Sequence, residues 1–252
     1  MKNTMGAISY RDADYPVREE FDQCHNRFWE RLAAPGCWLT AAQKVDIARE
    51  VRHAHNCALC QARKVALSPY QVPGTHDTVS DTLTENMVEV VHRIVTDPAR
   101  LTRKWFDDLM SDGLTPEVYV EILGTLVHIL VIDEFCRGLG IPLNDLPAPQ
   151  PGEPTGYRPK NASSGPGAWV PLLPPLIEDG PEADLWEAGA NVARALSLAP
   201  DEVRTLMDTI ACHYIPYESV IGDWTICPNG GLNRIQMEVI AARVSSHNEC
   251  FY

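Results

Sequence analysis

The sequence predicts an all-α protein made of two helical domains. Apolar residues recur three or four positions apart through most of the chain, the spacing of one helix face. Helix-capping residues precede these segments, and Pro or Gly ends them. Within residues 1–140 no stretch alternates polar and apolar residues for long enough to indicate a β-strand.

Six helices are expected in the first half of the chain. Their predicted ranges are 17–33, 41–54, 57–67, 83–97, 101–110 and 117–140. Thr115 and Pro116 form a strong helix start, with a capping hydroxyl followed by proline at the first helical position. The helix that follows is apolar almost all round, so we expect it to lie at the centre of the first domain.

The second half begins with a change of composition. Ten of the twenty prolines lie between Gly140 and Pro175, and such a stretch cannot hold a regular helix. We interpret 141–175 as a linker between a first domain at 1–140 and a second at 176–252. Helical patterning resumes at 183–215 and at 232–246.

Composition restricts the possible partners. The chain has 252 residues and a formal net charge of −13, which argues against nucleic acid or an anionic membrane surface as a partner. No segment has the apolar length of a membrane helix or the apolar region of a signal peptide. Eight cysteines without a leader indicate reduced thiols, so we expect a soluble cytoplasmic protein.

Cys57 and Cys60 are the two thiols at chemically useful spacing. If Asn56 caps the helix, they occupy its first and fourth positions and share one face. The positive end of the helix dipole lowers the pKa of thiols placed there, and Arg63 and Lys64 add positive charge. This pattern favours a redox dithiol.

Other interpretations of the histidines and cysteines remain open. Cys57 and Cys60 could be ordinary buried thiols, or half of a zinc site with His53 or His55, although no second C-x-x-C completes four ligands. His55 could also act as a base beside the thiols. Two histidines in apolar helices, His92 and His128, are expected to be core residues. The cysteines without paired spacing are expected to serve in packing: Cys24, Cys37, Cys136, Cys212 and Cys227.

The chain contains a weak internal repeat. Aligning Cys57 with Cys250 places residues 43–59 on 236–252 with five identities in seventeen positions, several of them at helical core positions. The second copy has Glu238 where the first has Val45. Twelve residues of straight helix span about 18 Å, so we expect the chain to turn between Glu238 and Cys250, at residues 245–248.

These residues resemble a known family. The spacing from Glu238 to Cys250 is similar to the opening of E-x11-C-x2-C-x3-H, the peroxidase motif of the alkylhydroperoxidase D and carboxymuconolactone decarboxylase superfamily. Residues 119–142 resemble the helix that follows the motif. The likeness is to two-domain, alkylhydroperoxidase-related members and covers nearly the whole chain.

The resemblance implies an all-α, thiol- or selenol-dependent peroxidase that needs no cofactor. A thiolate or selenolate would attack a hydroperoxide, Cys250 would resolve the product and Glu238 would move the proton. An external dithiol, thioredoxin-like or lipoyl-bearing, would reset the centre. We also expect a homo-oligomer.

Both copies depart from the family pattern. The first has Cys57 and Cys60, but Val45 and Lys64 stand at its glutamate and histidine positions. In the second, the sequence ends at Tyr252, one residue before the position of the attacking sulfur. We therefore expect either a fragment boundary or a UGA codon for selenocysteine at that point. The competing hypotheses are a decarboxylase- or isomerase-like enzyme and a non-catalytic assembly domain.

The first testable prediction is that Cys57 and Cys60 form a disulfide under mild oxidation. Their spacing at a helix start brings the two sulfurs near bonding distance. Peptide mapping by mass spectrometry of the oxidised protein should show this bridge. Separation of the two Cα atoms by more than about 7 Å would rule the bridge out.

Overall fold

The fold is all-α, as predicted. The structure is a computed structural model that describes residues 7–165, 167–186, 189–215, 221–227 and 231–250. Within these ranges there are nine α-helices, three short 3₁₀ helices and no β-strand. The only extended pairing among them is a single bridge between Ser163 and Leu172.

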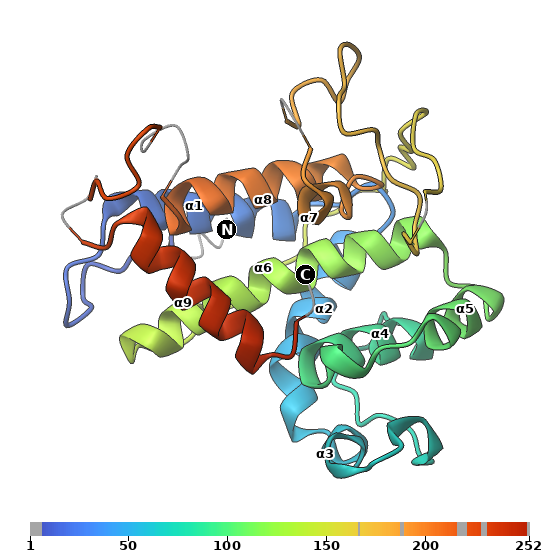
Figure 1. Ribbon diagram of the computed structural model, residues 1–252. Helices are drawn as coiled ribbons and strands as arrows, with labels where there is room; N and C mark the ends of the chain where they lie inside the picture. Colours follow the sequence, from blue (N-terminus) through green and yellow to red (C-terminus); the bar gives the residue numbers. More distant parts are fainter. Residues whose placement is uncertain (1–6, 166, 187–188, 216–220, 228–230, 251–252) are drawn as a thin grey trace.

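The helices of the first half lie where the sequence predicts them, within about two residues at each end (Figure 1). In chain order the elements are α1 (Glu19–Ala33), α2 (Ala41–His53), η1 (Ala54–Asn56), α3 (Ala58–Val65), η2 (Pro69–Gln71), α4 (Glu85–Thr96), η3 (Pro98–Arg100), α5 (Arg103–Ser111), α6 (Pro116–Leu139), α7 (Asn191–Arg194), α8 (Pro200–His213) and α9 (Arg234–His247).

Threonine caps explain why several helices start where they do. Thr40, Thr84, Thr102 and Thr115 each accept a hydrogen bond from the backbone N–H three residues later, at the starts of α2, α4, α5 and α6. At its other end α6 stops at Gly140, whose φ of 70° is left-handed and suits glycine.

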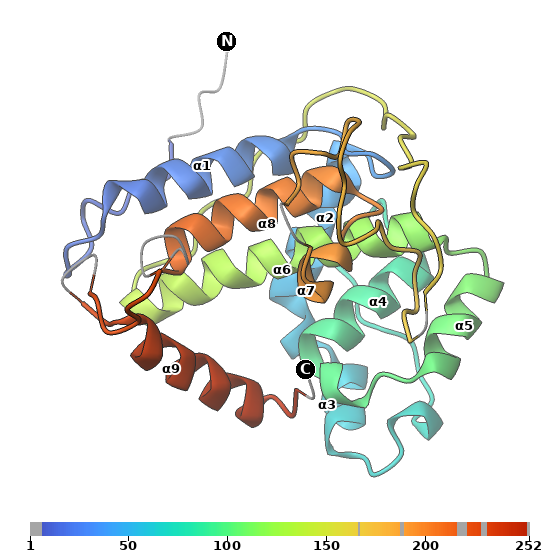
Figure 2. The same cartoon turned by 45° about the horizontal axis from the view of Figure 1, so that its top comes forward.

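The core is organised around α6. It packs against α1, α2, α4 and α8, and Figures 1 and 2 show it running between them. The side chains of Ile122, Leu126 and Ile129 are fully buried, which accounts for the apolar character of this helix on nearly all sides. In the described part of the chain no helix is both long enough and apolar enough to span a membrane.

The predicted linker does not separate two cores in the described structure. Leu126 of α6, Leu173 of the Pro-rich segment and Val203 of α8 belong to one hydrophobic cluster. The division into two domains therefore stays a prediction, without support from this packing. The helical prediction for 183–215 is only partly right, because α7 is a single turn and Pro200 begins a separate helix.

The repeat has a structural counterpart in α2 and α9. Both helices start with a capping box, Thr40 with Gln43 and Asn233 with Gln236, at positions 193 residues apart. Their surroundings differ, since most of α2 is buried and α9 has no buried residue among those described. Figure 2 shows α9, in red, on the outside of the helices.

The turn expected at 245–248 is displaced. The α9 helix continues to His247, and the chain turns at Asn248 and at Glu249, whose φ is 54°. The predictions for residues 251 and 252 lie outside the described residues.

A buried acidic pair lies between α6 and α8. Glu121 and Glu202 line a cavity of about 270 Å³ together with Lys44 of α2. Burial raises the pKa of Glu202 to about 7, with the charge of Lys44 opposing the shift and that of Glu121 adding to it. Glu202 is therefore neutral over part of the acid range in which an unfolded glutamate is ionised.

The second prediction is that Glu202→Gln stabilises the protein at high pH. Because its folded pKa is raised, Glu202 favours folding at low pH, and this contribution is lost as pH rises through about 7. The variant should gain up to about 3 kcal/mol in unfolding free energy between pH 5 and pH 8 relative to wild type, by urea titration.

The matched control is Glu134→Gln in α6, because the Glu134 side chain is exposed. That variant should show little difference from wild type at either pH. A Glu202→Gln effect that is equal at pH 5 and pH 8 would contradict the assignment of a raised pKa.

Candidate thiol–histidine site

The two cysteines of the C-x-x-C motif lie at the start of α3. Cys57 is the N-cap residue and Cys60 is the third helical residue, one position earlier than predicted for each. The Ala58 N–H, one of the free donors at this helix start, donates to the Asp77 carboxylate. Both cysteine side chains are buried and both thiols are free.

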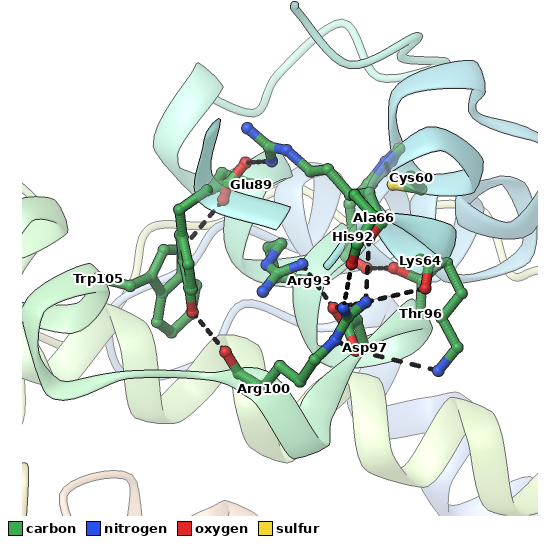
Figure 3. Close-up of polar contacts among 12 residues, drawn as sticks. Cys60, Lys64, Ala66, Glu89, His92, Arg93, Thr96, Asp97, Arg100 and Trp105 are labelled. Atoms are coloured by element: carbon green, nitrogen blue, oxygen red, sulfur yellow. Dashed lines mark hydrogen bonds and ion pairs between the residues drawn. The ribbon is translucent and has the colours of Figure 1, made fainter. Parts of the chain in front are cut away.

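The other end of α3 is held by Arg100. Its guanidinium donates hydrogen bonds to the backbone carbonyls of Arg63, Lys64 and Ala66, at distances of 2.7–3.0 Å (Figure 3). Asp97, at the end of α4, pairs with Arg100 at 2.8 Å. A cation at a helix C-terminus satisfies its free carbonyls and its dipole, so this contact fixes α3 against the end of α4.

Two imidazoles meet the thiols. His92 of α4 places Nδ1 at 3.3 Å from the Cys60 sulfur, and His76 of the α3–α4 loop places Nδ1 at 3.4 Å from the same sulfur. His76 Nδ1 is also 3.5 Å from the Cys57 sulfur. His92 is fully buried, as expected of a core histidine, and its ring also contacts a candidate reactive sulfur.

Each imidazole is backed by a carboxylate. The Nε2 atom of His92 lies 2.7 Å from Glu50 Oε2, and the Nε2 atom of His76 lies 2.6 Å from Glu89 Oε2. These contacts orient both rings with Nδ1 toward the sulfurs. The carboxylates are held in turn by further donors, which are Thr78 and the Val79 N–H on Glu50, and Arg63 and Trp105 on Glu89.

These contacts favour a thiolate beside imidazolium groups. Burial alone raises the pKa of the Cys60 thiol, but hydrogen bonds with His76 and His92 lower it to about 6. Burial lowers the histidine pKa values, whereas hydrogen bonds to Cys60 and to the carboxylates raise that of His76 to about 10 and that of His92 to about 9. Near neutral pH the metal-free site then holds a Cys60 thiolate.

Cys60 lies beside a surface cavity of about 690 Å³. His55 and Lys64 also line it, and Asn248 lines it from the end of α9. Cys57 does not line this cavity and is fully buried. Of the two thiols, Cys60 is therefore the one placed to meet a small molecule.

The remaining predicted site residues lie apart from the two thiols. His55 is exposed at the edge of the cavity, and its backbone carbonyl accepts a hydrogen bond from Gln61. Glu238 pairs with Arg234 at 2.6 Å, and together with the exposed Cys250 it lines a different surface groove along α9. The structure thus brings Cys57 and Cys60 together and adds His76, His92, Glu50 and Glu89, which the sequence analysis did not select as site residues.

The donor atoms of the site also suit a metal ion. Cys57, Cys60, His76 and His92 each offer one ligand atom, and these four atoms lie within 4.8 Å of one another. Thiolate and imidazole are ligands preferred by borderline and soft metals. A smaller group of three ligands, His25, Cys212 and His213, lies between α1 and α8.

The third prediction concerns the acidity of Cys60. In reduced, chelator-treated protein, alkylation of Cys60 by iodoacetamide should rise with pH through a midpoint near 6, because the thiolate reacts. His92→Asn should raise that midpoint by about one unit or more, since it removes a hydrogen-bonding cation. Peptide mapping at each pH measures the alkylated fraction.

His55→Asn is the matched control. His55 lines the same cavity as Cys60, and its hydrogen bond in this region is made by the backbone carbonyl, not by the imidazole ring. Its midpoint should equal that of wild type. A shift in His55→Asn and none in His92→Asn would identify His55 as the base instead.

Comparisons of the chain with protein-family models, curated proteins and solved structures found no match. Membership of the alkylhydroperoxidase D superfamily therefore stays a prediction that depends on the sequence motifs alone.

Proposed function

We propose that the protein is a thiol-dependent, peroxidase-like oxidoreductase in which Cys60 attacks a hydroperoxide and Cys57 resolves the product. The observation that carries this proposal is the position of the Cys60 sulfur, which contacts two carboxylate-backed imidazoles and borders a surface cavity. A stabilised thiolate with access to a small molecule is the requirement of this chemistry.

The first chemical step is attack of the Cys60 thiolate on one oxygen of the hydroperoxide. The O–O bond breaks, sulfur is oxidised to a sulfenic acid and the other oxygen leaves as an alcohol after taking a proton. His92 and His76 are the proton donors nearest to the attacking sulfur, at 3.3 and 3.4 Å. Imidazolium groups at that distance supply the proton without a separate acid.

The second step forms the disulfide. The Cys57 sulfur attacks the sulfenic sulfur of Cys60, an S–S bond forms and the oxygen leaves as water. Both sulfurs belong to the set of donor atoms that lie within 4.8 Å of one another, so little movement is needed. An external dithiol, thioredoxin-like or lipoyl-bearing, then reduces the disulfide by exchange.

Two histidine–carboxylate pairs would transfer the protons that one glutamate and one histidine transfer in the family motif. The resemblance places those groups at Val45 and Lys64, where this chain has neither. Glu50 lies within the span 45–64 that the motif covers. His76, Glu89 and His92 lie after it in sequence, and both histidines reach the Cys60 sulfur. This supports activity at the first copy of the repeat, whereas the sequence analysis assigned it to the second.

The fourth prediction separates the roles of the cysteines. Cys60→Ser should abolish peroxide consumption with an external dithiol, because it removes the attacking sulfur. Cys57→Ser should retain one attack per chain and accumulate a sulfenic acid that dimedone traps on Cys60. Peroxide loss and intact mass after trapping are the measurements.

Cys227→Ser is the matched control, since Cys227 is an exposed cysteine that makes no contact with the site. It should retain the wild-type rate. Loss of activity in Cys250→Ser with full activity in Cys60→Ser would move the reaction to the second copy. Absence of any peroxide-dependent thiol loss would favour a decarboxylase-like or non-catalytic protein.

The rate of peroxide consumption by the metal-free protein should also show a bell-shaped dependence on pH. It should rise as pH passes about 6, where the Cys60 thiolate forms, and fall above about 9, where His92 loses its proton. Glu50→Gln should lower the rate by roughly 10²–10⁴-fold if the His92 proton is used in the step. A flat profile between pH 5 and pH 10 would contradict this assignment.

A further inference from the structure

We propose that Cys57, Cys60, His76 and His92 together bind one Zn²⁺ ion in the reduced protein. The inference goes beyond the proposed redox function, because zinc binding requires no peroxide and no turnover. It uses the same two sulfurs, so a chain that holds zinc has no free thiolate at this site.

Three sulfur–nitrogen distances among the donor atoms match those of a tetrahedral zinc site. With zinc–sulfur bonds of about 2.3 Å and zinc–nitrogen bonds of about 2.0–2.1 Å, a sulfur and a nitrogen ligand lie about 3.5 Å apart. The observed separations are 3.3 Å for Cys60 with His92, 3.4 Å for Cys60 with His76 and 3.5 Å for Cys57 with His76. Two thiolates and two imidazoles form one of the common closed ligand sets for zinc.

The surroundings of the histidines are those that zinc ligands require. A ligating imidazole presents one nitrogen to the metal and donates its other N–H to a carboxylate, which fixes its orientation. His92 and His76 both turn Nδ1 to the sulfurs and Nε2 to a carboxylate, at 2.7 Å from Glu50 and 2.6 Å from Glu89. Two independent histidines with this same arrangement form a complete outer shell for one ion.

The local structure also lacks apolar contacts that would hold it without a metal. The apolar cluster at α3 consists of Cys57, Leu59 and Cys60 with the partly buried Val72, and it is separate from the main core. The connection from α3 to α4, residues 66–84, contains only the short η2 helix. Connections of this length are uncommon in compact domains. The second half of this one is tied to α2, because Glu50 accepts hydrogen bonds from Thr78 and the Val79 N–H and Asp46 accepts them from residues 80–82.

An ion at the four ligands would add an anchor at His76. Cys57 and Cys60 come from α3, His76 from the long connection and His92 from α4, so one ion would join three segments. Metal ions take this role in small structures whose apolar core is insufficient. All four ligands are buried or nearly so, which suits a closed site without an open coordination position.

The experiment measures metal binding to the full chain, reduced and freed of metal by chelation. Zinc added to this protein should bind at one ion per chain, as counted by native mass spectrometry. Co²⁺ in its place should give the intense visible bands of tetrahedral cobalt together with a thiolate charge-transfer band. Hydrogen exchange of residues 57–92 should slow when zinc is added, and alkylation of Cys57 and Cys60 should be blocked.

Variants test the ligands and their supports separately. Cys60→Ser and His76→Asn should lose the cobalt spectrum and the one-to-one binding. Glu50→Gln and Glu89→Gln should keep one-to-one binding but weaken it by roughly 10–100-fold. His55→Asn and Cys227→Ser should bind zinc as wild type does, since neither side chain contacts the four ligand atoms.

Two results would overturn the proposal. One is a reduced wild-type chain that binds no more zinc than the Cys57→Ser, Cys60→Ser double variant, with wild-type circular dichroism showing that both are folded. The other is equal loss of binding in His55→Asn and His76→Asn. Peroxide consumption by the metal-free protein is measured in parallel, so failure of zinc binding and failure of the redox function are seen independently.

Discussion

The contact of the Cys60 sulfur with two imidazoles holds together three segments that share little apolar surface. The other contacts that hold α3 and the connection after it are a few buried side chains, Arg100 at the C-terminal end of α3, and the polar contacts of residues 77–82 with α3 and α2. A buried thiolate attracts each of the two imidazolium groups strongly, whereas the two imidazolium groups repel each other, so the cluster needs further negative charge. Glu50 and Glu89 supply that charge.

The helices around α6 make this polar site possible. Glu50 projects from α2 and His92 from α4, and both helices pack directly against α6. Two rigid, buried helices can hold a histidine and a carboxylate at 2.7 Å with little loss of entropy on binding or reaction. The main apolar core therefore positions the site.

The same arrangement suits two chemistries that exclude each other on one chain. In the metal-free protein, the two sulfurs would carry out the proposed attack on a hydroperoxide and then form a disulfide. Bound to zinc, the sulfurs would be protected and the segment 57–92 tied to α4. Donor atoms that lie close enough for a metal also lie close enough for proton transfer, so geometry alone allows both and the metal content of the protein determines which applies.

The sequence predicted the helices well because their signals are local. Thr115 caps α6 as expected, and the C-x-x-C pair lies at a helix start within one residue of its predicted position. The failed helical prediction before α8 has a local cause too, since Pro200 cannot continue a helix from the residues before it.

The site could be predicted only in part, because its other half is assembled by tertiary contacts. His76 and His92 lie 16 and 32 residues from Cys60, and Glu50 lies 42 residues from His92. The available signal was an ionisable residue at a buried helical position, which applies to both Glu50 and His92. His76, in a polar loop, carried no such signal.

The Cys60 thiolate and the two imidazoles are proposed to form one interacting group. Nitrogen NMR of the histidine rings tests this interaction most directly. In reduced, metal-free protein, the rings of His76 and His92 should stay doubly protonated until the pH reaches about 9–10, well above the pKa of an ordinary histidine. In Cys60→Ser both should lose their protons at lower pH. Titration of both rings near pH 6.5, unchanged by Cys60→Ser, would contradict the account.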